Sequence, residues 1–287
     1  MATRSRRRFD DDDFTDFPSI PTTSRTDVDD DVIEPKWSTY TDATHGPSPA
    51  PAWVVTSPNA IDTDVGVMKT GKEADVSLLR REHDGVVSLM AVKKYRSAQH
   101  RMFHRDSGYL EGRRVRRSRE TRAMATRTEF GRDLIAGQWA SAEFAVLGKL
   151  WTAGAAVPYP VQLSGTELTM EFIGDDDGAG GGVAAPRLAQ LRPTFREGES
   201  LYAQLREALT ALAEAGYAHG DLSAYNILVH RGRLVLIDLP QAVDLVGNPQ
   251  GFEFLRRDCE NICTWFHTHG IPADAQELRR DLLRGIS

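Results

Sequence analysis

The chain has 287 residues, of which 40% are hydrophobic and 26% charged, and its formal net charge is −6 at pH 7. This length and composition fit one two-lobed domain with a tail, and they exclude a chain too polar to form a packed core. The sequence contains no apolar run of membrane length, and its basic N-terminus lacks the apolar stretch of a secretory signal, so we expect a cytoplasmic protein without a membrane partner.

Residues 1–51 are expected to form a disordered, charged tail. A basic cluster stands beside an acidic one there, and Ser, Thr, Asp and Pro follow with few aliphatic residues. From Trp53 the pattern becomes globular, and we place a folded domain at residues 52–287. We divide this domain into an N-lobe near residues 52–172 and a C-lobe near residues 173–287.

Apolar residues in the N-lobe predict several short strands and one helix. Strands are expected at residues 74–79, 86–94, 161–163 and 168–173. A helix is expected at residues 141–151, because its apolar residues recur at three- and four-residue spacing.

The C-lobe is predicted to be mainly helical. It begins with an acidic, then glycine-rich stretch at 174–185, which we expect to be a flexible loop. A leucine stripe predicts a helix at 200–215, and two strands at 227–230 and 234–237 flank the turn Arg231-Gly232. Two further helices are predicted at 254–267 and 273–284. Strands first and helices later indicate an α+β chain with two lobes.

The two cysteines, Cys259 and Cys263, lie four positions apart in a predicted helix. No second pair completes a zinc site, so we expect two reduced thiols in or near a core.

The strongest chemical signal is the segment HGDLSAYN at residues 219–226, followed by Ile237-Asp238. Phosphoryl transfer needs a carboxylate that orients the attacking group and oxygen ligands that hold a metal on the phosphates. Asp221 fits the first role, and Asn226, five residues later, offers an amide oxygen to Mg²⁺. Asp238 comes after two short strands, where a kinase places its main metal-binding aspartate.

An upstream lysine and a helical carboxylate complete this set. Lys93 ends an apolar strand, where a kinase lysine reaches the α- and β-phosphates. Lys94 competes for that role, but only one of two successive strand residues faces a cleft. Glu143, in the predicted helix, is the expected partner of Lys93.

A loop suited to phosphate binding precedes these strands. The sequence KTGKEADV at residues 69–76 has one glycine, so it differs from the GxGxxG of ordinary kinases. It can still cover phosphates with backbone N–H groups, the Thr70 hydroxyl and the Lys72 ammonium.

Taken together, these motifs resemble the RIO family of atypical serine/threonine kinases. TGKEADV, AVKKY, MEFIG, HGDLSAYN, IDLPQ and FEFLRRDC occur in the family's order and span about residues 65–267. The branch with an N-terminal winged helix is less similar. The resemblance implies a trimmed kinase fold without a full activation segment or the usual peptide-docking helices, and a member of bacterial type.

The resemblance also implies ATP and Mg²⁺ as cofactors, with Mn²⁺ as the alternative ion. Asp221 would be the catalytic aspartate, assisted by Lys93 and Glu143, while Asn226 and Asp238 would bind the metal. Met170 would lie behind the adenine, and Ser223 stands where ordinary kinases carry a γ-phosphate-binding lysine. The implied nucleotide-binding residues are Thr70, Gly71, Lys72, Lys93, Met170, Glu171, Ile173 and Ser223, with Glu171 and Ile173 acting through their backbones.

Two positions depart from the family pattern. Lys69 replaces the small hydroxyl residue that usually precedes Thr70, and a glycine run at 178–182 looks like an insertion. The first could alter phosphate contacts, and neither removes a catalytic group.

A strongly basic segment between Lys93 and Glu143 is the candidate partner surface. We expect it either to be a solvated loop or to contact nucleic acid, an acidic partner or the protein's own acidic tail. Its arginines are Arg101, Arg105, Arg113, Arg114, Arg116, Arg117, Arg119 and Arg122.

Three functions remain open from the sequence, and a nucleotide-binding pseudokinase scaffold is a less favoured fourth, because no catalytic position is missing. The first is a serine/threonine protein kinase of unknown substrate, self-phosphorylation included. The second is an ATPase-type switch that binds a larger assembly through a phospho-aspartate at Asp238. The third is a small-molecule kinase of the aminoglycoside type, which shares HGDxxxxN but not the GKEA loop or FEFLRRDC.

Overall fold

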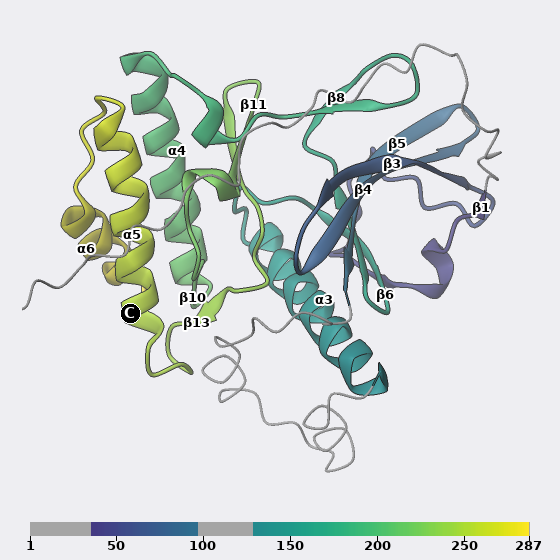
Figure 1. The fold of residues 1–287 in the computed structure, drawn as a ribbon, viewed down its shortest axis with the longest axis horizontal. Helices are drawn as coiled ribbons and strands as arrows, with labels where there is room; N and C mark the ends of the chain where they lie inside the picture. The colour runs from purple at the N-terminus through teal and green to yellow at the C-terminus, as the bar shows by residue number, and fades with distance from the viewer. Residues whose placement is uncertain (1–35, 97–128, 287) are drawn as a thin grey trace, which may run out of the picture. The chain divides into compact units, whose positions relative to one another are not determined.

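The computed structural model describes residues 36–96 and 129–286, and the antiparallel sheet in it is built from separate stretches of the chain (Figure 1). Its strand order is β1-β3-β4-β5-β7-β6-β2. The strands are β1 (Lys36–Trp37), β2 (Thr44–His45), β3 (Ile61–Thr70), β4 (Ala74–His83), β5 (Val86–Tyr95), β6 (Pro160–Ser164) and β7 (Glu167–Glu171).

The first two strands correct the predicted boundary of the disordered tail. β1 pairs with the start of β3, and β2 pairs with β6, so both belong to the sheet. A helical turn, η1 (Tyr40–Asp42), lies between them. A strand of two residues is too short to show the alternating pattern by which strands are predicted from a sequence. Both strands form because the edges of the larger sheet supply their backbone partners. Residues 1–35, the rest of the predicted tail, lie outside the described residues.

β3, β4 and β5 form a meander of which the sequence predicted only two strands. The predictions at 74–79 and 86–94 are confirmed and extend to ten residues each. β3 was missed because its pairing with β4 is irregular and its acidic residues and glycine interrupt the apolar pattern. The turn between β4 and β5 is Asp84-Gly85, with φ of 50° and 76°, which is the geometry of a two-residue hairpin.

The predicted flexible loop at 174–185 is instead a small hairpin. β8 (Gly174–Asp176) pairs with β9 (Gly182–Ala184), and the Asp177 carboxylate accepts hydrogen bonds from two backbone N–H groups of the turn. Glycine is required here by close approach, because a Cβ on Gly174 would lie 2.3 Å from the Val183 carbonyl oxygen.

The helices largely match their predictions. α3 (Glu129–Thr152) begins twelve residues before the predicted helix at 141–151 and contacts β5, β6 and β7. The other helices are α4 (Phe195–Glu214), α5 (Gly251–Thr268) and α6 (Ala275–Arg284). α4 starts at a reciprocal cap between Thr194 and Glu197. None of the helices in the part of the chain described here is long and apolar enough to cross a membrane.

Short strands join the helices. β10 (Tyr217–Ala218) pairs with β13 (Val243–Asp244), and β11 (Ile227–His230) pairs with β12 (Arg233–Leu236). The β11–β12 hairpin confirms the predicted pair of strands within one residue. Two helical turns, η2 (Leu188–Gln190) and η3 (Ala224–Asn226), stand before and between these strands.

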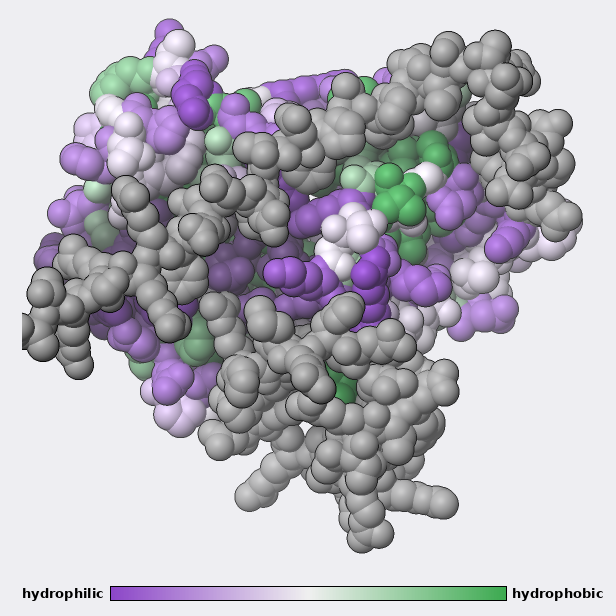
Figure 2. Space-filling view, in the orientation of Figure 1, coloured by the Kyte–Doolittle hydropathy of each residue, from purple (hydrophilic) through white to green (hydrophobic). Residues whose placement is uncertain are grey.

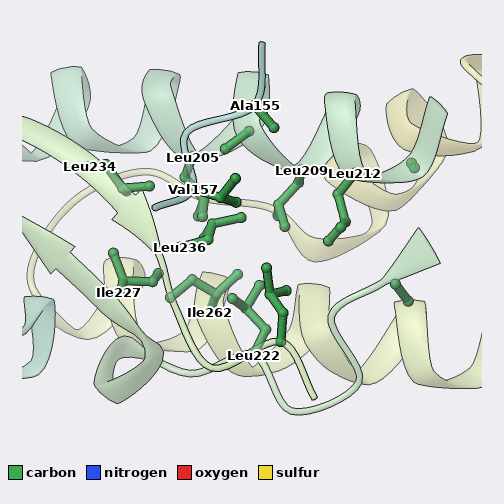
Figure 3. Packing of buried hydrophobic residues seen from close by; sticks show 14 of the residues in the cluster. Ala155, Val157, Leu205, Leu209, Leu212, Leu222, Ile227, Leu234, Leu236 and Ile262 are labelled. Atoms are coloured by element: carbon green, nitrogen blue, oxygen red, sulfur yellow. The ribbon is translucent and has the colours of Figure 1, made fainter. Parts of the chain in front are cut away.

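The main apolar core lies against the leucine stripe of α4 (Figure 3). Leu205, Leu209 and Leu212 of α4 belong to the same cluster as Leu222 and Ile227, which stand on either side of the segment 223–226. Leu222 and Ile227 are fully buried. The core therefore anchors both ends of the segment that carries Ser223 and the predicted metal ligand Asn226, and Leu222 directly follows Asp221.

Both cysteines are free and buried on α5, as expected. Several large apolar side chains stay exposed on separate elements, and Figure 2 shows hydrophilic and hydrophobic residues mixed over the described part of this face. The exposed set includes Trp37, Val67, Val183, Phe195 and Val246.

Candidate active site

The alternation of β5 decides which of its two lysines faces the interior. Lys93 is 9% exposed, and its ammonium contacts two carboxylates. Lys94 points to the other face, where it pairs with Glu167 at the surface. The structure thus places Lys93, and not Lys94, inside the predicted site.

Glu143 of α3 connects three parts of the chain. The Lys93 ammonium lies 3.1 Å and 3.0 Å from its two carboxylate oxygens. The same carboxylate accepts hydrogen bonds from the Tyr95 hydroxyl and, at 3.0 Å, from the Leu239 N–H group. Glu143 is 1% exposed, so this arrangement is shielded from water. Sequence reasoning missed Tyr95, although its position two residues after Lys93 puts it on the same face of the strand.

Asp238 meets Lys93 from the opposite side. One carboxylate oxygen lies 2.6 Å from the Lys93 ammonium, while the side chain remains 43% exposed. Partial burial opposes ionisation of Asp238, but Lys93 outweighs it and lowers the pKa of this carboxyl to about 2. Burial likewise opposes the charge on Lys93, and its two carboxylate partners outweigh that and raise its pKa. Both groups are therefore charged at neutral pH.

The backbone of Asp238 is left-handed, with a φ of 65°. This conformation is uncommon outside glycine, and aspartate is among the residues that tolerate it best. It sits between Ile237, whose N–H donates to the Asn226 carbonyl at 3.0 Å, and Leu239, which is held by Glu143.

The segment 219–226 is fixed by hydrogen bonds at both ends. Asn226 donates its side-chain N–H to the Asp221 carbonyl oxygen at 2.8 Å, which leaves the amide oxygen for another partner. His219 is fully buried and its Nε2 contacts the Ile237 carbonyl oxygen at 3.1 Å. The Asp221 carboxylate itself is at an exposed position. The Asn226 side chain thereby holds the backbone of Asp221, and the Asn226 carbonyl oxygen holds Ile237, the residue before Asp238.

Asp258 of α5 is a positioning residue that sequence reasoning missed. Its carboxylate is 2% exposed and accepts the N–H groups of Gly220 and Leu222 at 2.8 Å and 3.0 Å, on either side of Asp221. Burial raises its pKa. The signal was available in FEFLRRDC, whose aspartate is the one charged residue of α5 that is buried.

Replacing Asp258 by alanine should lower the free energy of unfolding by about 2–5 kcal/mol, because two buried N–H groups lose the carboxylate that accepts their hydrogen bonds. Urea unfolding followed by circular dichroism measures this. Glu260→Ala on the same helix is the matched control, since Glu260 is exposed and its pairing with Arg256 should contribute less than about 1 kcal/mol. Equal losses in the two variants would contradict the role given to Asp258.

The phosphate-loop residues lie in the turn between β3 and β4. Gly71 donates to the Ala74 carbonyl oxygen at 3.0 Å, and a Cβ on Gly71 would lie 2.9 Å from that oxygen. Thr70 and Lys72 are exposed on either side of it. The tight turn therefore explains the single glycine of this loop.

The backbone groups expected at the adenine edge are only partly available. The Glu171 N–H donates to the Tyr159 carbonyl oxygen at 2.9 Å, and the Ile173 carbonyl oxygen accepts from Ala185 at 2.9 Å. The backbone groups still expected to contact the adenine edge are therefore the Glu171 carbonyl and the Ile173 N–H. Met170, in the strand before them, and Ser223, next to the catalytic segment, are half-buried.

The oxygen donors of the site can hold Mg²⁺ when phosphates supply further ligands. Asn226 contributes an amide oxygen and Asp238 a carboxylate, both of which are ligands that Mg²⁺ prefers. Among the described residues no group of three or more His, Cys, Asp or Glu side chains could hold a metal. The set therefore fits an ion that takes its remaining ligands from a nucleotide and water.

This fold, an antiparallel sheet with α3 against it and a helical C-terminal part, is that of the kinase-like proteins. The computed structure resembles the crystal structure of the Rio2 kinase from Chaetomium thermophilum, with a TM-score of 0.54 at 23% identity, over 78% of this chain and 62% of that one. A second crystal structure, of that kinase in an ADP/Mg²⁺-phosphoaspartate complex, gives 0.53 at 21% identity over 75% and 60%. The expected α+β, two-lobed class is confirmed.

A sequence model of the RIO domain matches residues 81–278, and the chain belongs to this family of atypical serine/threonine kinases. It is 35% identical to the RIO-type serine/threonine-protein kinase Rio1 of Haloferax volcanii over 249 residues, which cover 86% of this chain and 77% of the relative. It is 31% identical to the human serine/threonine-protein kinase RIO1 over 217 residues, but this covers only 34% of that protein.

Family membership confirms the resemblance seen in the motifs and disfavours the small-molecule kinase that the catalytic segment alone left open. Only residues 239–250 separate Asp238 from α5, as expected for a trimmed kinase. The basic segment predicted to contact a partner lies within residues 97–128, outside the described residues.

Proposed function

We propose that this protein is an ATP- and Mg²⁺-dependent serine/threonine protein kinase that also phosphorylates itself. The observation that carries the proposal is the meeting of Lys93, Glu143 and Asp238, which come from a strand, a helix and a loop far apart in the sequence. The two carboxylates hold the Lys93 ammonium in a position where it can contact phosphate oxygens. Charge-assisted hydrogen bonds from an ammonium to phosphate are stronger in a site shielded from water than at the surface.

Each residue has a distinct task in the transfer. Lys93 orients the α- and β-phosphates, and Asn226 and Asp238 would hold Mg²⁺, which neutralises phosphate charge when bound. Asp221 orients the substrate hydroxyl and takes its proton as the hydroxyl oxygen bonds to the γ-phosphorus and the bond to ADP breaks. Thr70, Gly71 and Lys72 cover the phosphates, while the Glu171 carbonyl and Ile173 N–H bind the adenine edge beside Met170.

A second candidate function is an ATPase-type switch. The Asp238 carboxylate is ionised and 43% exposed, as a nucleophile must be. In this scheme one of its oxygens bonds to the γ-phosphorus, ADP leaves, and water later hydrolyses the acyl phosphate to free phosphate and carboxylate. The phosphoaspartate named for the related Rio2 complex supports this alternative.

The two functions are separated by the chemistry of the labelled protein. The full chain is incubated with Mg²⁺ and γ-labelled ATP, with and without general protein substrates, and protein label and free phosphate are measured. A kinase gives label that withstands acid and hydroxylamine and lies on Ser or Thr. A switch gives label on the chain that hydroxylamine removes, together with free phosphate.

Lys93→Met should reduce either activity about tenfold or more, because the phosphates lose a charge-assisted contact. Lys94→Met is the matched control on the opposite face and should leave activity unchanged. If the wild type consumes no ATP with Mg²⁺ present, or if the two variants behave alike, the proposed function is wrong.

A further inference from the structure

The Tyr95 ring lies against the Lys93 ammonium on the face of β5 that points into the site. Tyr95 follows Lys93 by two residues, so strand alternation directs both side chains to the same face. The Lys93 ammonium lies over the ring, 5.2 Å from its centroid. A cation within about 6 Å of an aromatic face is attracted to it, and the attraction is stronger where water is excluded. Tyr95 is 5% exposed and gives Lys93 an uncharged partner beside its two carboxylates.

The Tyr95 hydroxyl holds the carboxylate that in turn holds Lys93. It donates to Oε2 of Glu143, and the same oxygen lies 3.0 Å from the Lys93 ammonium. The other oxygen, Oε1, accepts from Lys93 and from the Leu239 N–H. Burial raises the pKa of Tyr95 well above its usual value, so the hydroxyl keeps its proton and donates to Glu143. Each oxygen of Glu143 is therefore fixed by a second donor besides Lys93.

Tyr95 also connects the phosphate loop to α3. It stands directly opposite Ala74, the first residue of β4 after that loop. It packs in a buried cluster with Ala74 and with Ala136 and Ala140 of α3. Alanine at these three positions leaves the space that a tyrosine ring needs between the strands and the helix. Tyr95 therefore links three elements of the proposed site: the strand that follows the phosphate loop, its own strand β5, and α3.

We propose that Tyr95 is a positioning residue for phosphoryl transfer, whose hydroxyl and ring fix the Lys93 ammonium where it contacts the phosphates. This inference rests on the proposed function. Asp238 also serves as a metal ligand in that function, and its side chain is 43% exposed. Glu143 and Tyr95 are buried, so they are the neighbours that keep Lys93 in place. Tyr95 acts through Lys93 and Glu143, and not on the nucleotide directly.

A double-mutant cycle in Mg²⁺ATP affinity, measured by calorimetric titration of the full chain, tests this role. Tyr95→Phe keeps the ring and removes the hydroxyl, and it should weaken ATP binding about tenfold. In a Glu143→Gln background the same change should weaken binding about twofold or less, because the hydroxyl then meets a neutral amide in place of the carboxylate. Tyr95→Leu also removes the ring and should weaken binding more than Tyr95→Phe does.

Tyr159→Phe is the matched control. Tyr159 is likewise buried, and its hydroxyl donates to the Pro47 carbonyl oxygen at 2.8 Å. It packs with Met90, which alternates to the face of β5 opposite Lys93. Removing this hydroxyl should lower stability in urea unfolding, because a buried acceptor loses its donor, but it should leave ATP affinity unchanged.

The outcomes separate this inference from the proposed function. If the wild type binds Mg²⁺ATP and Tyr95→Phe binds it equally well, the positioning role is wrong while the nucleotide site stands. The role is also wrong if the losses in Tyr95→Phe and Glu143→Gln simply add, or if Tyr95→Phe and Tyr159→Phe weaken binding alike. If the wild type binds no Mg²⁺ATP, the proposed function fails, and this inference fails with it.

Discussion

Phosphoryl transfer should fall by about 10²- to 10⁴-fold when Asp221 is replaced by asparagine, while Mg²⁺-dependent ATP binding persists. Asparagine keeps the size of the side chain but cannot take the proton of the attacking hydroxyl. The Asp221 carbonyl oxygen, which orients Asn226, belongs to the backbone and survives the change. Because the Asp221 side chain is exposed, the fold should be unaffected.

Initial rates of transfer and calorimetric ATP binding measure the two parts of this expectation. Asp84→Asn is a matched control, because Asp84 is an exposed aspartate in a hairpin turn where asparagine tolerates the same positive φ. A variant at position 221 with the wild-type rate would remove Asp221 from the chemistry. Loss of ATP binding together with the rate would instead assign it to nucleotide binding.

Glu143→Ala should lower the free energy of unfolding by about 3–5 kcal/mol, because it breaks a buried ion pair. It also leaves the Tyr95 hydroxyl and the Leu239 N–H without the carboxylate that now accepts both. Lys93 would keep Asp238 as its remaining partner, so phosphate binding should weaken as well.

Urea unfolding of this variant is best compared with Glu167→Ala. Glu167 forms an ion pair of similar length, 2.7 Å, with Lys94, but both side chains are well exposed, and its loss should cost at most about 1 kcal/mol. Glu143→Gln keeps the volume and one acceptor, and an intermediate loss is expected. A loss in Glu143→Ala no larger than that in Glu167→Ala would show that the buried ion pair contributes little to stability.

The parts of the site that follow local rules were predictable from the sequence. Strand alternation separated Lys93 from Lys94, and the helical pattern placed Glu143 on the element that packs against β5. The spacing of Asp221, Asn226 and Asp238 described a turn and a hairpin, which are short-range structures.

The residues that were missed act through contacts between distant parts of the chain. Asp258 reaches backbone groups 38 and 36 residues away, and Tyr95 reaches Glu143 over 48 residues. The sequence pattern could place Asp258 and Tyr95 on the inner faces of their elements, but it does not identify the distant groups that they contact. The hairpin at 174–184 was misjudged for a different reason: its glycines suggested flexibility, whereas they permit two backbones to pack closely.

Glu143 has a consequence for how the protein could be turned off. The Glu143 carboxylate on α3 positions both the Lys93 ammonium of β5 and the backbone N–H of Leu239, the residue after Asp238. A small displacement of that helix would release both at once, even with every side chain of the cleft intact. The activity could then be regulated without a group that blocks the nucleotide site, because a shift of α3 by about the length of a hydrogen bond would suffice to break both contacts.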